Sequence, residues 1–514
     1  MQRFQYYIDG EFLDGEARYP SVDPATGLIW AEMPEARESD VDRAVNAAET
    51  ALYDGPWAKT TATQRGKLLY KLADLVAANA QKLAELETRD TGKIIRETSA
   101  QIAYVADYYR YYAGLADKIE GSYLPIDKPD MDVWLRREPI GVVAMMVPWN
   151  SQLFLSAVKI GPALAAGCTM VVKASEDGPA PLLEFARLVH EAGFPAGVVN
   201  IITGFGPSCG AALGRHLKVA HVAFTGGPET ARHVVRNSAE NLASTSLELG
   251  GKSPFIVFAD ADLESAANAQ VAGIFAATGQ SCVAGSRLIV ERSVKDAFLS
   301  ILKRKAEAIR IGSPLEMATE AGPLATKRQQ DHVAALVEKS VQSGARLVTG
   351  GAQTRGGGVF FPPAVLGFDD RARDVLASGW GGPGHEPVTR DAETLPALGA
   401  LIRRMHDAQS GYEPPPDWHE EPLEPPPGVS RGSEVVCHND FATYNLIVRD
   451  DRLVGVIDFD FASPGPRLWD LAYLAYRIVP FVEDAHDPGD LDRDARLAAL
   501  VEAYEALTPE QRSD

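Results

Sequence analysis

The chain has few cysteines and lacks long apolar runs. Its four cysteines, Cys168, Cys209, Cys282 and Cys437, form no C-x-x-C pair among 514 residues. This usage fits a reducing compartment better than a disulfide scaffold. The first residues, Met1–Tyr6, lack the apolar core of a signal peptide, and no apolar run is long enough to span a bilayer. We therefore expect a cytoplasmic chain with no membrane partner.

The chain also lacks an excess of basic residues. Its 50 lysines and arginines are outnumbered by 70 aspartates and glutamates, which gives a net charge of −20. Binding to nucleic acid needs a basic face for the phosphates, so this balance argues against a nucleic-acid partner. The length exceeds what one hydrophobic core can hold and predicts about three structural units.

The apolar spacing changes along the chain. Between residues 39 and 91 it is helical, and from residue 141 short apolar runs alternate with helical patterns. The expected strands are Val142–Val147, Met170–Val172, Val198–Ile202, Val222–Phe224 and Phe255–Phe258, and the expected helices are Leu153–Ala166, Ala180–Ala192 and Glu229–Asn241. Such alternation predicts a doubly wound parallel sheet, which binds ligands at the carboxyl ends of its strands.

Polar motifs follow three of these predicted strands. Pro148–Asn150 closes the first strand and Lys173–Glu176 closes the second. Phe224–Pro228 closes another and opens a helix, with proline in the first turn. A helix N-terminus that is preceded by glycines is a ready phosphate site, so we expect a phosphate-bearing ligand here.

A thiol and a carboxylate stand out later in the chain. Cys282 follows a predicted helix and lies among small residues, while Glu248 ends an apolar strand before two glycines. Apolar surroundings raise the pKa of a carboxyl group and favour a general base. A thiol needs an open, electropositive site to be a good nucleophile. A lone cysteine is more often structural, and a lone glutamate is usually a surface residue. The two residues therefore indicate a catalytic site only in combination.

These motifs, in this order and with Glu248 and Cys282 separated by 34 positions, resemble those of the aldehyde dehydrogenase superfamily. The resemblance covers about residues 1–368. It implies that Cys282 attacks an aldehyde and that the Asn150 amide and the Cys282 backbone N–H hold the resulting oxyanion. Hydride then passes to NAD, and Glu248 activates the water that hydrolyses the thioester.

The resemblance also implies an NAD site. Lys173 and Glu176 would bind the adenosine ribose, and the Glu176 carboxylate would repel a 2′-phosphate, which favours NAD over NADP. Gly227 departs from the serine common at that position, which removes one phosphate hydrogen bond. For Trp149 and Gly227 simple packing is the alternative interpretation. The full set of expected cofactor residues is Trp149, Lys173, Ser175, Glu176, Gly206, Phe224, Thr225, Gly226, Gly227, Leu249 and Gly250.

The resemblance breaks off near residue 368. The predicted strand within 360–366 should lead to a Glu-Glu-x-Phe-Gly-Pro-Val motif, and the chain contains no such motif. In the family this later part supplies the carboxylate on the nicotinamide ribose, more of the substrate pocket and the last strand of the oligomerisation sheet. We therefore expect impaired oxidation, and the homo-oligomer that the family forms is in doubt here.

The C-terminal part has chemistry of its own. Val436–Asn445 and Val454–Asp460 carry carboxylates and an amide in short loops, and they resemble the C-terminal lobe of the aminoglycoside phosphotransferase family over about residues 375–514. The resemblance implies that Asp440 is the base and that Asn445 and Asp458 bind Mg²⁺. The chain has no nucleotide-binding N-terminal lobe to match.

The predicted architecture is therefore α/β, with a doubly wound parallel-sheet domain followed by an incomplete α/β catalytic domain and a kinase-like C-lobe fragment. The expected divisions are an NAD-binding domain at 1–250 with an oligomerisation hairpin at 122–140, a catalytic domain at 251–368, a joint at 369–390 and a phosphotransferase-like fragment at 391–514. The function expected is NAD-dependent oxidation of a small-molecule aldehyde. The alternatives are ATP-dependent phosphorylation of a hydroxyl and a non-catalytic fusion.

Overall fold

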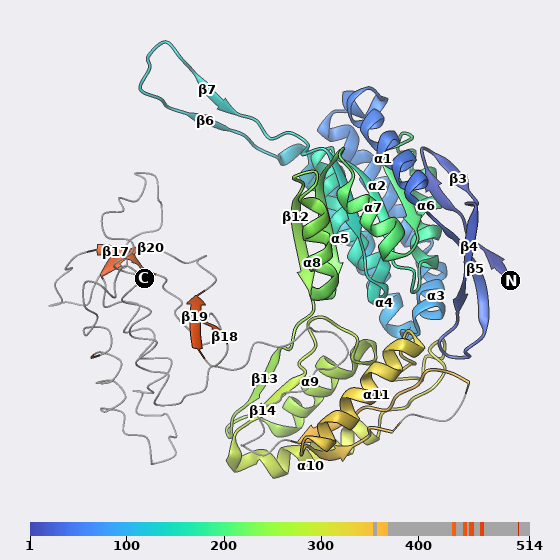
Figure 1. Ribbon diagram of the computed structural model, residues 1–514, viewed down its shortest axis with the longest axis vertical. Coiled ribbons are helices and arrows are strands. Elements are labelled where there is room, and N and C mark those ends of the chain that lie inside the picture. The colour runs from blue at the N-terminus through green and yellow to red at the C-terminus, as the bar shows by residue number, and fades with distance from the viewer. Residues whose placement is uncertain are drawn as a thin grey trace. The chain divides into compact units, whose positions relative to one another are not determined.

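The computed structural model describes residues 1–352 and 357–367, four short strands between 434 and 466, and residue 502 (Figure 1). The chain divides into two compact units, Met1–Gly382 and Pro383–Asp514. The domain limits expected from the sequence at 250, 368 and 390 stay predictions. Among the described residues, no helix has the length and the apolar content needed to cross a membrane.

A seven-stranded sheet forms the centre of the first unit. Its order is β12 (Ser244–Leu249), β11 (Val219–Gly226), β8 (Val142–Met146), β9 (Thr169–Ala174), β10 (Val199–Thr203), β2 (Tyr6–Ile8) and β3 (Glu11–Leu13). The strands from β12 to β10 run parallel, and β2 and β3 are antiparallel to their neighbours. Every residue of β8, β9 and β10 is buried, which explains why these strands are continuous apolar runs in the sequence.

Helices cover both faces of this sheet, as in a doubly wound fold (Figure 1). One face carries α5 (Gln152–Ala166) and α6 (Ala180–Ala192), and behind them lie α2 (Ala62–Ala78), α3 (Ala80–Thr91) and α4 (Ile95–Leu115). The other face carries α1 (Glu38–Tyr53), α7 (Ala211–Arg215) and α8 (Pro228–Ser238). The α/β fold and the predicted strand and helix order are confirmed.

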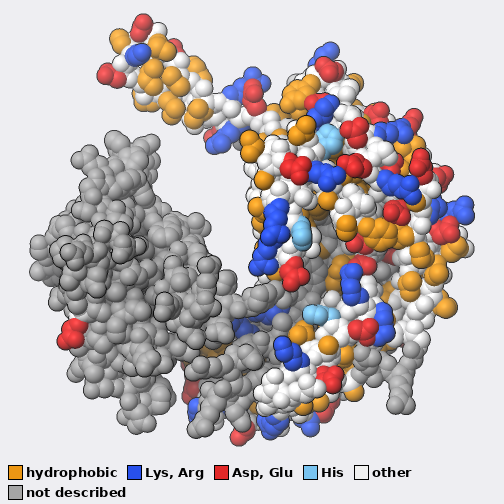
Figure 2. All heavy atoms as spheres, in the orientation of Figure 1, with side chains coloured by type: hydrophobic (Ala, Val, Ile, Leu, Met, Phe, Trp, Pro, Cys, Tyr) orange, Lys and Arg blue, Asp and Glu red, His pale blue; other side chains and the backbone are white. Residues whose placement is uncertain are grey.

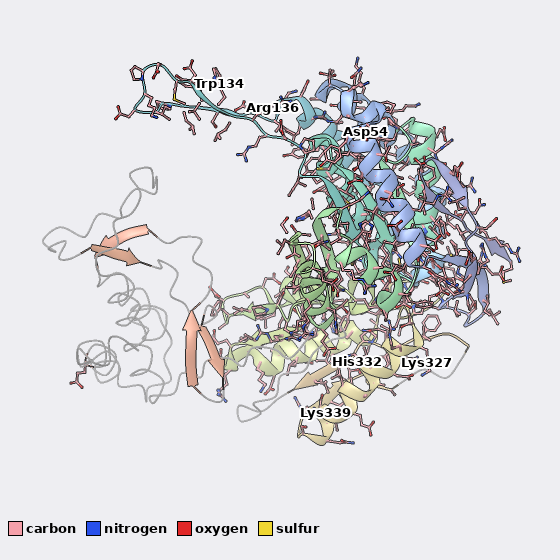
Figure 3. All side chains as sticks on the ribbon, turned by 45° about the horizontal axis from the view of Figure 1, so that its top comes forward. Asp54, Trp134, Arg136, Lys327, His332 and Lys339 are labelled. Carbon is pink, nitrogen blue, oxygen red and sulfur yellow. The ribbon has the colours of Figure 1, made fainter. Side chains whose placement is uncertain are left out.

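Two smaller sets of strands lie outside this sheet. The first is the three-stranded sheet of β1 (Gln2–Arg3), β5 (Ile29–Glu35) and β4 (Ala17–Val22). The second is the hairpin of β6 (Ser122–Leu124) and β7 (Val133–Leu135), which projects away from the sheet (Figure 1). Trp134 on this hairpin is 72% exposed, and apolar side chains gather along it (Figures 2 and 3). Its role in oligomerisation stays a prediction.

A second lobe of the first unit follows residue 250. Here β13 (Pro254–Val257) pairs in parallel with β14 (Arg287–Val290), next to α9 (Leu263–Phe275) and α10 (Lys295–Glu307). Then come α11 (Lys327–Gln342) and the antiparallel pair β15 (Arg346–Thr349) and β16 (Val365–Gly367). The labelled side chains of α11, Lys327, His332 and Lys339, are exposed (Figure 3).

The two faces of the β13–β14 pair differ. Val257 on one face is buried in a cluster with Phe298 and Leu302 of α10. On the other face Ile256 is 55% exposed and Ile289, its register partner, is 52% exposed. It is unusual for an apolar face of a sheet to be exposed. A lobe that is incomplete would leave such a face uncovered.

Only short strands are described in the second unit. They are β17 (Glu434–Cys437) paired with β20 (Ser463–Pro466) and β18 (Leu446–Arg449) paired with β19 (Arg452–Val456), both antiparallel. The predicted base Asp440 and the predicted Mg²⁺ ligands Asn445 and Asp458 lie outside the described residues.

A buried carboxylate ties the elements of the first unit together. Asp90, in the last turn of α3, accepts hydrogen bonds from the Ser21 hydroxyl, from Trp30 Nε1 at 3.1 Å and from the Ala180 backbone N–H at 2.8 Å. It thus connects β4, β5 and α6 to α3. Burial, opposed by these hydrogen bonds, raises the pKa of Asp90 to about 6.

We therefore predict that Asp90 makes stability fall with rising pH. The folded chain keeps the Asp90 proton up to about pH 6, whereas the unfolded chain loses it near pH 4, so this contribution is fully present below pH 4 and is lost as the pH rises through 6. The shift corresponds to about 3 kcal/mol. Between pH 4 and 8 the melting temperature of the unmutated chain should fall relative to that of Asp90→Asn, because the variant has no group that titrates at this position.

The matched control is Asp54→Asn, which changes an exposed carboxylate at the end of α1 (Figure 3). This variant should follow the pH dependence of the unmutated chain. A constant difference in melting temperature between Asp90→Asn and the unmutated chain across the pH range would contradict the argument.

Candidate active site

The polar residues expected at strand ends do meet along one edge of the sheet. The segment after β8 forms a short 3-10 turn at Trp149–Ser151, and the segment after β9 carries Ser175 and Glu176. The end of β11 leads through Gly227 into α8. Because these strands are adjacent and parallel, their carboxyl ends lie at the same edge, where a doubly wound sheet binds its ligand.

The loop that leads to Cys282 has an unusual backbone. After α9 the chain makes a short turn at Ala276–Gly279, and the φ angles of Ala277 and Thr278 are 50° and 55°. Residues with a Cβ rarely adopt this left-handed conformation, because the Cβ crowds the following carbonyl oxygen. Surrounding structure must therefore hold the turn. Cys282 lies just beyond it and is half-buried.

Side chains from two other parts of the fold bind this nucleophile loop, residues 276–282. The Asn150 amide donates through Nδ2 to the backbone oxygen of Gln280 at 2.8 Å. Both carboxylate oxygens of Glu97, in the first turn of α4, accept from the Ala277 backbone N–H at 3.0 and 3.2 Å. The buried Gln280 side chain in turn accepts from the Ala325 N–H at 3.0 Å. Asn150, the predicted oxyanion donor, is thus fixed to the loop that carries Cys282.

A buried lysine, Lys93, hydrogen-bonds to the segment that carries Asn150. Lys93 Nζ donates to Ser151 Oγ at 2.7 Å and to Gln101 Oε1 at 2.6 Å, and it lies 3.5 Å from the Asn150 backbone oxygen. Burial lowers the pKa of Lys93, opposed by the charges of Glu87 and Glu97. Lys93, Glu97 and Gln280 were not predicted, because no sequence motif marks them and because Ser151, Ala277 and Ala325, which they contact, are distant along the chain.

Glu248 does not lie in the apolar surroundings expected from the sequence. It belongs to β12, which is the edge strand of the sheet, and its side chain is exposed. The prediction was wrong because the run of apolar neighbours does not reveal that β12 has a partner on one side only. The Glu248 charge acts on buried Lys159 of α5, where it opposes the effect of burial, which lowers the pKa of that lysine.

The chain after Glu248 approaches the nucleophile closely. A Cβ added at Gly251 would lie 3.3 Å from the backbone oxygen of Cys282, which is a tight contact. The paired glycines therefore let the backbone after β12 lie against Cys282. This places the predicted base and the predicted nucleophile on adjoining segments.

The residues after β9 form an ion pair. Lys173 Nζ lies 2.9 Å from Glu176 Oε2, and the lysine is almost fully buried while Glu176 is partly exposed. Burial on its own would raise the pKa of Glu176, but the adjacent Lys173 ammonium outweighs burial and holds that pKa below its usual value. An ionised carboxylate is therefore presented beside a buried cation.

Open space lies beside two glycines of the predicted cofactor site. A Cβ added at Gly227, the N-cap of α8, or at Gly206, in the turn after β10, would meet no atom within 4 Å. The buried side-chain oxygens Asn150 Oδ1 and Thr225 Oγ1 have no hydrogen-bond partner among the described residues. Room beside a helix N-terminus together with orphaned polar atoms fits a dinucleotide with its phosphates at α8.

The remaining predicted cofactor residues also lie at this edge or close to it. Trp149 is half-buried, and Ser175 Oγ accepts from the Asp177 N–H at 3.3 Å. Phe224 packs against Gly226, where a Cβ would lie 2.4 Å from the ring. Leu249 is 36% exposed at the end of β12, next to Gly250. No group of histidine, cysteine or carboxylate side chains suited to a metal ion occurs in the described part of the chain.

Comparison with known proteins identifies two matched regions. Residues 12–376 match the model of the aldehyde dehydrogenase family, and residues 423–510 match that of a phosphotransferase enzyme family. These matches confirm both resemblances seen in the sequence.

Relatives of the first region share much of its sequence. One is the (Z)-2-((N-methylformamido)methylene)-5-hydroxybutyrolactone dehydrogenase of Acinetobacter baylyi, 69% identical over 366 residues, which are 71% of this chain and 75% of that protein. Another is the hydroxyisobutyraldehyde dehydrogenase of Mycolicibacterium austroafricanum, 41% identical over 72% of this chain and 73% of that protein. The NAD⁺ complex of an aldehyde dehydrogenase from Bacillus cereus superposes with a TM-score of 0.70 at 42% identity, over 71% and 75% of the two chains.

The cysteines of the described residues should differ in reactivity. Cys168 and Cys209 are buried, and burial raises the pKa of Cys209 to about 12, whereas Cys282 is half-buried. Because the thiolate is the form that reacts, we predict that iodoacetamide at pH 8 labels Cys282 at least about tenfold faster than either. Peptide mass mapping over time measures this, with Cys282→Ser as the control. Equal labelling of Cys209 would refute it.

Proposed function

This chain belongs to the aldehyde dehydrogenase family, and on that premise we propose that it oxidises an aldehyde to a carboxylic acid through a thiohemiacetal and a thioester on Cys282. NAD, when bound, accepts the hydride. The observation that carries the proposal is the hydrogen bond from Asn150 to Gln280, two residues before Cys282. It holds an amide donor beside the loop of the nucleophile.

The first step is attack on the aldehyde. Cys282 Sγ bonds to the carbonyl carbon, and the oxygen takes up negative charge. The Asn150 amide carries two hydrogens, one of which is engaged with Gln280. The other amide hydrogen and the Cys282 backbone N–H are the donors that we assign to the oxyanion.

The last step is hydrolysis of the thioester. We assign Glu248 as the base that takes a proton from water, because the backbone beyond it passes against Cys282. Its exposure lets water reach the carboxylate. The attack of hydroxide on the acyl carbon then breaks the C–S bond and releases the carboxylic acid and the Cys282 thiolate, which takes the proton from Glu248 and becomes the thiol again.

The dinucleotide is assigned to the edge of the sheet already described. Lys173 and Glu176 would hold the adenosine ribose, and the start of α8 with Gly206, Phe224, Thr225, Gly226 and Gly227 would hold the phosphates. Trp149, Ser175, Leu249 and Gly250 would line the rest. The open space at Gly206 and Gly227 supports this placement.

We propose a substrate class from the most similar relative described above. That relative is named as the dehydrogenase of a substituted 5-hydroxybutyrolactone. A lactone with a hydroxyl on the carbon that bears the ring oxygen is the closed form of an aldehyde with a carboxyl group. An aldehyde of this type, in equilibrium with its cyclic form, is therefore our candidate substrate.

Two further parts of the proposal concern assembly and the second unit. The exposed hairpin β6–β7 suits a homo-oligomer of this chain, and we propose a cytoplasmic location. The match of residues 423–510 to a phosphotransferase family favours ATP-dependent phosphorylation of a hydroxyl, with Mg²⁺, as the second candidate function. It ranks second because the match to the aldehyde dehydrogenase family covers residues 12–376, whereas this match covers only residues 423–510.

The Glu176 carboxylate should select NAD. An ionised carboxylate repels the 2′-phosphate of NADP, so the unmutated chain should bind NAD more tightly, and Glu176→Ala should narrow the ratio of the two dissociation constants at least about fivefold. Calorimetric titration with both dinucleotides measures the ratio. Glu176→Gln is the matched control for shape without charge and should behave like Glu176→Ala. Equal affinities in the unmutated chain would rule out this role.

The break near residue 368 should affect the two half-reactions differently. Acyl transfer needs Cys282 and Asn150, which lie before the break, whereas hydride transfer needs a well-placed nicotinamide. A displacement of about 1 Å costs on the order of 10²-fold in rate. We predict that aldehyde oxidation falls further below the rates usual for the family than hydrolysis of p-nitrophenyl acetate does.

Both rates are measured in one preparation, so misfolded protein lowers both alike and leaves their ratio informative. Cys282→Ala should abolish both activities. NAD reduction at the usual rate without ester hydrolysis would show that the missing segment is dispensable.

A further inference from the structure

We infer that Glu97 is a positioning residue for the nucleophile, and that it acts by holding the Ala277 amide so that the left-handed turn before Cys282 persists. The inference rests on the proposed role of Cys282. Glu97 lies on α4, behind the sheet, and touches the nucleophile loop 180 residues further along the chain.

The geometry of the contact is specific. Both carboxylate oxygens accept from one backbone N–H, that of Ala277, at 3.0 and 3.2 Å. Ala277 and Thr278 both have positive φ angles without being glycine. A free loop would leave this conformation, because the right-handed region costs less for such residues. The carboxylate supplies a charge-assisted hydrogen bond at the point where the turn begins.

The surroundings of Glu97 keep it in place. Burial raises the pKa of Glu97, opposed by the Ala277 hydrogen bond and by the charges of Lys93 and Arg96. Lys93 in turn binds Ser151 and the Asn150 backbone. One short segment, residues 93–97, thus contacts both the backbone of Asn150 and the loop that carries the thiol.

The contact is not needed to join the two lobes of the first unit. Arg96 donates to the Thr319 backbone oxygen at 2.9 Å, and the Ile95 N–H donates to Pro314 O at 2.8 Å. These bonds attach the start of α4 to the second lobe independently. Loss of the Glu97 carboxylate should therefore loosen the nucleophile loop and leave the lobes attached.

The test combines amide hydrogen exchange with kinetics on the full chain. Glu97→Ala removes both acceptors, whereas Glu97→Gln keeps one carbonyl oxygen at the same reach. Asp107→Ala is the matched control, because it removes an exposed carboxylate from the same helix, away from the nucleophile loop. The double variant Glu97→Ala with Ala277→Gly relieves the left-handed turn, since glycine adopts a positive φ without strain.

In Glu97→Ala we expect exchange in the peptide that spans 273–282 to speed up at least about tenfold, with α4 unchanged. The kcat for p-nitrophenyl acetate should fall on the order of 10- to 100-fold, with KM within about twofold because the loss is one of alignment. The fall in kcat should be smaller in Glu97→Gln than in Glu97→Ala, and the double variant should recover part of the lost kcat. Asp107→Ala should keep the exchange of 273–282 and the kcat of the unmutated chain.

Unchanged exchange in 273–282 overturns the inference, and so does faster exchange with an unchanged kcat. A double variant with a kcat no higher than that of Glu97→Ala also overturns the inference, because relief of the left-handed turn should raise the kcat. If Cys282→Ala hydrolyses the ester as fast as the unmutated chain, the proposed function fails. The exchange data alone then decide whether Glu97 holds the loop.

Discussion

Two hydrogen-bonded contacts to one short loop connect the parallel sheet and its helices to the loop of Cys282, the thiol that we propose as the nucleophile. Asn150, at the end of a central strand, binds Gln280, and Glu97, in the first turn of α4, binds Ala277. Between them lies a turn with two non-glycine residues in the left-handed conformation, which the chain does not adopt without support. The position of Cys282 therefore depends on the large-sheet part of the fold as much as on its own lobe.

This dependence matters because the second lobe is the less complete part. The match to aldehyde dehydrogenases covers about three quarters of each relative described above, and one face of its short sheet leaves Ile256 and Ile289 exposed. Of the groups proposed for acyl transfer, Asn150 follows a fully buried strand of the large sheet, whereas Cys282 lies in the second lobe. The carboxylate that the resemblance assigns to the nicotinamide ribose belongs to the motif absent from this sequence.

The sequence predicts most of the parallel sheet and its helices, since continuous apolar runs and glycine or proline signals at element ends are local features. The predicted bounds of α6, Ala180–Ala192, agree with the structure. Exposure of Glu248 was not predictable, because the edge position of β12 depends on the order of all strands. Glu97 escaped notice for a similar reason: its partner Ala277 is 180 residues away, and nothing in the local pattern marks that contact.

The central claim is that Cys282 is held ready for acyl transfer by residues that this chain contains. Its most direct test is to mix the protein with an activated ester, quench with acid after a few milliseconds to seconds, and map the peptides by mass spectrometry. The account predicts an acyl group on the Cys282 peptide that appears and decays within the time course, and that persists in Glu248→Gln. A chain that hydrolyses the ester while Cys282 never carries the acyl group would contradict it.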